Sequence, residues 1–199
     1  MTLRLLPATL PRRCTAAALI LLASASFAAP PSANRLPPES IYHLEIGLQD
    51  QAGRSFHLAE LRGTIYLVSM FYTSCQYVCP TTIETMKQTL AQLPESQRGQ
   101  ARALMVSFDP KRDSVQVLDR VAHEHGLDPR VWTLARTDAT SARKLAAILG
   151  VQYRALADGD FNHSTRLLLI DREGRIAGQT EVIGKVEPAL VAQLRALTP

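Results

Sequence analysis

The sequence has only a short apolar run, and it lacks internal repeats and, beyond its first 29 residues, an excess of one charge. Its longest stretch of apolar and small residues, 14–29, has sixteen residues, whereas a spanning helix needs roughly 20. Three of the 22 basic residues, Arg4, Arg12 and Arg13, lie in the N-terminal leader, residues 1–29. The rest of the chain then has 19 basic against 18 acidic residues. The near-neutral remainder gives little support to a nucleic-acid or membrane-surface role, and we expect no nucleic-acid partner, despite a sequence pI of 9.2.

The leader has the features of an export signal. It combines a positive start with the apolar stretch and with small residues that offer cleavage sites before residue 30. We predict that residues 1–29 are a signal peptide or an uncleaved anchor, that 30–39 are a linker, and that 40–199 form one domain. The protein is then exported to the periplasm. Association with the inner membrane through the N-terminus stays open.

Cysteine is nearly absent. Besides Cys14 in the leader, the chain has only Cys75 and Cys79, in Phe-Tyr-Thr-Ser-Cys-Gln-Tyr-Val-Cys-Pro at residues 71–80. Such an isolated pair indicates chemistry at sulfur, in a compartment where a disulfide persists. The pair can close a disulfide, which needs Cβ atoms only about 4 Å apart. Its two soft sulfurs can equally bind a soft metal such as Cu(I). The spacing alone leaves both uses open.

Pro80 disfavours helical geometry at the residue before it. We therefore expect a helix that begins at Pro80, with Cys79 at or next to its N-cap and Cys75 in the preceding loop. The positive end of a helix favours negative charge, so this arrangement predicts that thiolate forms more readily at Cys79.

Hydrophobic patterns place the pair between a strand and a helix of an α/β domain. Alternating strands and helices imply parallel pairing, followed by an antiparallel hairpin and a closing helix. This is a thioredoxin-like three-layer fold with a mixed sheet and an added N-terminal β-hairpin. The expected strands are 41–47, 54–58, 64–72, 103–108, 131–135, 165–170 and 175–180, and the expected helices are 80–93, 113–125, 140–149 and 187–197.

Proline is absent between Pro129 and Pro188. Oxidoreductases of this fold usually have a cis-proline in the loop that faces the cysteines, and this chain has His163 there instead. The histidine in place of a proline favours a metal ligand. A hydrogen-bonded surface histidine is the alternative, and position alone gives the two equal weight. His123 and His125 are two apart on one helix and cannot share a face, so they are expected to be solvated.

Three segments together resemble the Sco/SenC family, copper proteins needed to assemble the CuA centre of cytochrome c oxidase. They are the Cys75–Cys79 motif, Ser-Phe-Asp-Pro-Lys-Arg-Asp at 107–113, and His163-Ser164 before the strand at 167–171. The resemblance implies a thioredoxin-like fold and one copper ion per chain, held by Cys75, Cys79 and His163. It also implies an oxidase subunit carrying the CuA site, or another copper acceptor, as partner.

Two residues depart from the family pattern. Gln76 stands where proline is common, and Asn162 stands where aspartate often precedes the ligand histidine. A carboxylate there orients the imidazole and raises its basicity, so we expect Asn162→Asp to tighten copper binding.

Two functions follow from these residues. The first is a metallochaperone that delivers copper to the CuA centre and is not an enzyme in the turnover sense. The second is an exported thiol–disulfide oxidoreductase that uses Cys75 and Cys79 as a redox-active pair on a copper-site apoprotein.

Overall fold

A strand buried along its whole length lies near the middle of the sheet. All seven residues of β3, Ile65–Phe71, are buried. They form seven parallel pairs with β4, Ala101–Ser107, and β4 in turn pairs in parallel with β5, Trp132–Arg136.

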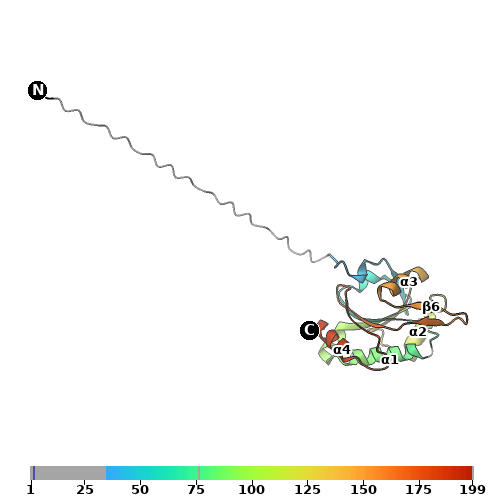
Figure 1. Cartoon of the computed structure of the whole chain (residues 1–199). Helices are drawn as coiled ribbons and strands as arrows, with labels where there is room; N and C mark the ends of the chain where they lie inside the picture. The colour runs from blue at the N-terminus through green and yellow to red at the C-terminus, as the bar shows by residue number, and fades with distance from the viewer. Residues whose placement is uncertain (1, 3–34, 76, 199) are drawn as a thin grey trace. The chain divides into compact units, whose positions relative to one another are not determined.

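The structure is a computed structural model that describes residue 2 and residues 35–75 and 77–198 (Figure 1). The predicted leader, apart from residue 2, and residues 30–34 of the predicted linker lie outside the described residues.

The main sheet has seven strands in the order β2-β1-β5-β4-β3-β8-β9. On the other side of β3, β8 pairs antiparallel with β3 and β9 pairs antiparallel with β8. The sheet is therefore mixed, as predicted. The remaining strands are β1 (Gly47–Asp50), β2 (Ser55–His57), β6 (Tyr153–Ala155), β7 (Phe161–His163), β8 (Leu167–Ile170) and β9 (Ile176–Thr180).

Helices cover both faces of this sheet. Helices α1, Val78–Ala91, and α4, Pro188–Leu197, lie together on one side, and α3, Ala139–Ile148, lies on the other (Figure 1). Helix α2, Val115–Glu124, contacts β5 and β1. Short 3-10 helices are η1 (Ile41–His43), η2 (Leu58–Leu61) and η3 (Glu95–Gln100). Over the described ranges, no helix is both long and apolar enough to span a bilayer.

The N-terminal strand prediction was wrong in position. Residues 41–43 form the 3-10 helix η1, capped by Ser40, and the strand β1 begins only at Gly47. Strands β1 and β2 pair antiparallel across the predicted turn, in which the carboxylate of Asp50 accepts hydrogen bonds from Ala52 N and Arg54 N, each at 2.9 Å. Strand β1 also pairs antiparallel with β5, so these strands extend the central sheet.

A second hairpin was missed altogether. Strands β6 and β7 pair only with each other and form a separate two-stranded sheet, called the ribbon below (residues 153–163). Each strand has only three residues, so the sequence shows no alternation long enough to recognise. The ribbon matters because its last residue is His163.

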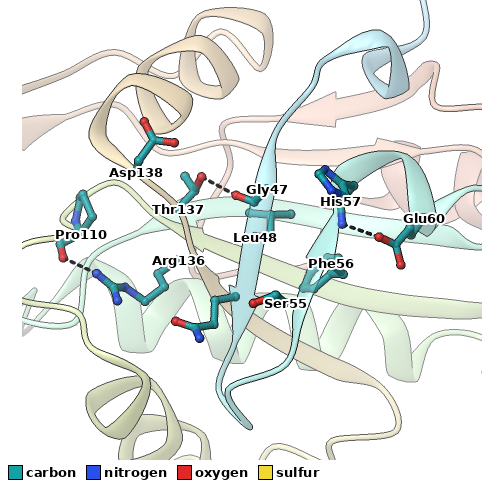
Figure 2. Close-up of a pocket in the computed structure, with 11 residues that line it drawn as sticks. Gly47, Leu48, Ser55, Phe56, His57, Glu60, Pro110, Arg136, Thr137 and Asp138 are labelled. Atoms are coloured by element: carbon teal, nitrogen blue, oxygen red, sulfur yellow. Dashed lines mark hydrogen bonds between the residues drawn. The ribbon is translucent and has the colours of Figure 1, made fainter.

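The outer edge of the sheet borders an open groove (Figure 2). Gly47 O accepts a 2.6 Å hydrogen bond from the Thr137 hydroxyl, and Arg136 Nη2 donates to Pro110 O at 2.8 Å. The groove holds about 580 Å³ and its lining contains neither a cysteine nor His163. The sulfur chemistry therefore lies elsewhere, beyond Phe71 at the end of β3.

The turn between β8 and β9 packs against residues 40–42, at the start of the domain. Gly174 has φ +84°, and its carbonyl accepts a 2.9 Å hydrogen bond from Ile41 N. A Cβ at Gly174 would lie 2.4 Å from Ser40 Oγ and 2.6 Å from the Tyr42 ring. We predict that Gly174→Ala lowers the free energy of unfolding by about 2–4 kcal/mol, the sum of left-handed strain and overpacking.

Gly63→Ala is the matched control, because Gly63 has φ +90° but no atom lies within 4 Å of the position that a Cβ would take there. It should lose only about 1–2 kcal/mol. Equal losses for the two variants in urea unfolding would show that the contact with Tyr42 and Ser40 does not matter.

Candidate metal centre

The two cysteines lie where β3 gives way to α1. Cys75 is half-buried in the connecting loop and Cys79 is buried in the first turn of α1, and neither is in a disulfide. Both contact the main-chain carbonyl of Tyr72: Cys75 N donates to it at 3.4 Å and Cys79 Sγ at 3.3 Å. The structure thus confirms that the pair sits at a strand-to-helix junction.

The helix start differs from the prediction. Helix α1 begins at Val78 with Tyr77 as N-cap, so Cys79 is already inside the helix and Pro80 is its third residue. Proline is tolerated there because the first N–H groups of a helix have no partner within the helix. The N–H groups of Tyr77, Val78 and Cys79 lie within hydrogen-bonding reach of the Cys75 sulfur, in the loop before the helix.

Cys75, not Cys79, is the stabilised thiolate. The Cys79 thiol lies within hydrogen-bonding reach of the Cys75 sulfur and, with the backbone N–H groups of Tyr77, Val78 and Cys79, lowers the pKa of Cys75 to about 4 against the opposing effect of burial. The same hydrogen bond, together with burial, raises the pKa of Cys79. The expectation that Cys79 ionises first is wrong, because the helix begins two residues earlier than the proline indicated.

His163 ends strand β7 and is half-buried among aromatic rings. Its ring lies 5.5 Å from the Tyr72 ring at 86° and 5.4 Å from the Phe108 ring. Its Nδ1 lies 3.2 Å from Ser164 O. A carbonyl can only accept, so this hydrogen bond places the proton on Nδ1 and leaves the Nε2 lone pair available.

The three predicted ligands lie near one another but do not form one metal site as they stand. In residues 35–75 and 77–198, no three His, Cys, Asp or Glu side chains form a group that could hold a metal ion as they stand. The Cys79 thiol lies within hydrogen-bonding reach of the Cys75 sulfur. The ring of His163 lies beside that of Tyr72, whose carbonyl both cysteines approach.

Asn162 has no contact with the imidazole that would make it the orienting partner. It pairs with Arg154 across the ribbon and is exposed, and neighbouring residues of a strand point to opposite faces. The nitrogen that it was expected to orient binds Ser164 O instead. The sequence-based role of Asn162 is therefore wrong for this structure.

Three other histidines lie on or next to η1 and α2. His123 is exposed on α2, and its Nδ1 lies 2.8 Å from Asp119 O, one turn back in the same helix. His43 Nε2 lies 2.8 Å from Pro37 O. His125 is the C-cap of α2. The exposure of His123 agrees with its predicted solvated role, whereas His125 is half-buried.

A buried carboxylate beneath the cysteine loop was missed. Asp113 is fully buried and accepts hydrogen bonds from Thr73 N at 3.1 Å and from the hydroxyls of Thr73 and Ser107. Burial raises its pKa, and these hydrogen bonds oppose the rise. The predicted helix began at residue 113. In the structure Ser114 caps α2, by accepting from Val117 N, which leaves Asp113 to hold the loop.

Comparison with known proteins places the chain in a family. Residues 39–198 match the SCO1/SenC family. The chain belongs to this family. Human SCO2 homolog, a mitochondrial protein, is 28% identical over 138 residues, which cover 64% of this chain and 49% of that protein. The matched regions make up less than two thirds of each of the first curated relatives.

Solved structures of Sco proteins share the fold. Bradyrhizobium japonicum ScoI with copper bound has a TM-score of 0.64 at 24% identity, covering 76% of this chain and 96% of that one. BsSco, a member of the Sco family of cytochrome c oxidase assembly proteins in which a disulfide switch was identified, has a TM-score of 0.64 at 18% identity, covering 76% and 90%. These likenesses confirm the predicted thioredoxin-like fold of this Sco chain.

We predict that Cys75 reacts with iodoacetamide at mildly acidic pH, while Cys79 does not. Only the thiolate is nucleophilic. Because the lowered pKa of Cys75 is about 4, its reactive form persists down to that pH and is lost only as pH falls through it. Alkylation between pH 5 and 8, followed by mass mapping of the two cysteines, measures this. A rate that rises about tenfold per pH unit up to pH 8, as for an ordinary thiol, would refute the stabilised thiolate.

Proposed function

We propose that this chain is a copper metallochaperone. It holds one copper ion through Cys75, Cys79 and His163 and passes it to an acceptor. The observation that carries the proposal is the placement of Cys75 and Cys79 at the carbonyl of Tyr72, whose ring lies 5.5 Å from that of His163. The neighbouring thiol and the amides of the helix start lower the pKa of Cys75 to about 4. A thiolate is the form of cysteine that binds metal, and at neutral pH this one needs no proton removed.

The donor set fits copper in its soft, reduced state. Two cysteine sulfurs are soft ligands and an imidazole with a free Nε2 is a borderline one, a combination that suits Cu(I). The aromatic rings of Tyr72, Phe108 and Phe161 beside His163 provide an apolar wall. When bound, copper is cargo here, and the residues described supply ligands and a lowered pKa.

The acceptor in this proposal is the oxidase subunit that carries the CuA site, or another copper protein. Support comes from ScoI with copper bound and from the description of BsSco as a member of a cytochrome c oxidase assembly family. The proposed place of action is the periplasm, reached through the N-terminal leader. Copper transfer at one ion per chain involves no catalytic turnover.

A second function is favoured by the asymmetry of the two thiols. In a thiol–disulfide oxidoreductase, the Cys75 thiolate attacks a disulfide of a copper-site apoprotein and forms a mixed disulfide. Cys79 then attacks the Cys75 sulfur, which releases the target with two thiols and leaves a Cys75–Cys79 disulfide. A partly exposed low-pKa cysteine beside a buried high-pKa partner is the arrangement such a step needs.

Our first functional prediction concerns copper affinity. In a competition titration with a Cu(I) chelator, Cys75→Ala, Cys79→Ala and His163→Ala should each weaken binding by more than about 100-fold. Loss of a group that merely holds a ligand already costs about 10–100-fold.

The controls are His123→Ala and Asn162→Asp, which should both bind copper as the wild type does, since neither residue contacts the site. Wild-type affinity in His163→Ala would remove His163 from the ligand set. Tighter binding in Asn162→Asp would restore the orienting role that the structure denies to Asn162.

The oxidised state gives a further prediction. Mild oxidant should join Cys75 and Cys79 in an intramolecular disulfide, because the Cys79 thiol lies within hydrogen-bonding reach of the Cys75 sulfur, and copper binding should be lost with the thiolate. Mass spectrometry after blocking free thiols, together with the same copper titration, measures both effects. Free thiols that survive oxidation without dimer formation would contradict both proposed functions of the pair.

A further inference from the structure

One residue contacts all three proposed ligands. The main-chain carbonyl of Tyr72 accepts from Cys75 N at 3.4 Å and from Cys79 Sγ at 3.3 Å. The ring of the same residue lies edge-on to the ring of His163, with centroids 5.5 Å apart. Tyr72 is 3% exposed, so these contacts are made in the interior at the end of β3.

The side chain of Tyr72 also reaches the tip of the ribbon. Its hydroxyl donates a hydrogen bond to the carboxylate of Asp160, a residue 88 positions further along the chain. Its ring lies 5.1 Å from that of Phe161, the first residue of β7. Asp160 precedes His163 by three residues, so this hydrogen bond joins the element that carries the cysteines to the element that carries the histidine.

The rest of the ribbon is held by ring contacts and by arginine side chains. Its strands pair only with each other, but the Phe108 ring stacks on that of Tyr153 with centroids 4.6 Å apart and lies 5.3 Å from that of Phe161. Arg143 lies within hydrogen-bonding reach of the Tyr153 hydroxyl, and the Arg112 guanidinium lies 5.4 Å from the Phe161 ring centre. These contacts hold the two strands, and the hydroxyl–carboxylate bond is the directional contact that joins the tip of the ribbon to the end of β3.

We propose that Tyr72 is a positioning residue, and that its hydrogen bond to Asp160 is a latch that holds His163 beside the cysteine loop. This inference rests on the proposed copper site. The latch lowers the cost of ordering the ribbon when an ion is bound, and so raises affinity without contacting the ion.

Tyr72→Phe is the central test, because it removes the hydroxyl and keeps the ring. Each variant is made in the full chain carrying Cys14→Ser, so that only two cysteines remain. Tyr72→Phe and Asp160→Ala should each lower Cu(I) affinity about tenfold, the effect of one hydrogen bond to a charged group. The double variant should lose no more than either single one, because both remove the same interaction.

Two controls separate positioning from general stability. Tyr66→Phe removes the hydroxyl of another buried tyrosine on β3, one that faces Arg102 and not the site, and it should bind copper as the wild type does. In a His163→Ala background, Tyr72→Phe should cause no further loss of affinity. A merely structural role would lower affinity in that background too.

A metal-free measurement tests the latch independently of copper. Amide hydrogen exchange over residues 156–163 should be several-fold faster in Tyr72→Phe and Asp160→Ala than in Tyr66→Phe, since the ribbon tip loses its tie to β3. Unchanged exchange would overturn the latch.

The two proposals fail in different ways. If the wild type binds no Cu(I), the proposed function is wrong, and the exchange measurement still decides whether the latch exists. If the wild type binds Cu(I) and Tyr72→Phe and Asp160→Ala bind it equally tightly, the positioning role is wrong while the copper site stands.

Discussion

The candidate site depends on a carboxylate that is fully buried under it. A buried charge is costly unless hydrogen bonds replace water, and Asp113 obtains them from the ends of two neighbouring parallel strands, through Thr73 after β3 and Ser107 at the end of β4. The same bonds therefore fix the two strand ends to each other and set the direction in which the chain leaves β3. Because Cys75 follows Thr73 by two residues, the path of the cysteine loop is determined by a group that never touches sulfur.

That path gives the two cysteines unequal chemistry. The loop turns back so that the free amides at the start of α1 meet the sulfur of Cys75, while Cys79 is carried into the buried side of the same helix. The two pKa values then move apart, since that of Cys75 is lowered and that of Cys79 is raised. Metal capture and thiol exchange both use the thiolate, which is why the geometry supports two functions at once and gives both to the same residue.

The sequence was a reliable guide wherever a pattern was local and long. The buried run of β3, the helix after it and the isolated sulfur pair were all visible as local patterns. The errors arose where tertiary contacts decide. Pro80 indicated a helix start that the cysteine loop overrides, and the three-residue strand ending at His163 is too short to show alternation. Tyr72 and Asp113 were missed because a tyrosine after a strand and an aspartate before a helix have ordinary local explanations. Their roles arise from partners 88 and 40 residues away.

The distance along the chain between the parts of the site has a consequence for folding. Cys75 and Cys79 are four residues apart and meet in any chain that turns once, whereas the contact of Tyr72 with the ribbon closes a loop of 88 residues and so needs most of the domain in place. The sulfur pair can therefore form before the imidazole is in place. In the proposed copper site, the redox state of the surroundings then acts on the two thiols before the full set of proposed ligands is assembled.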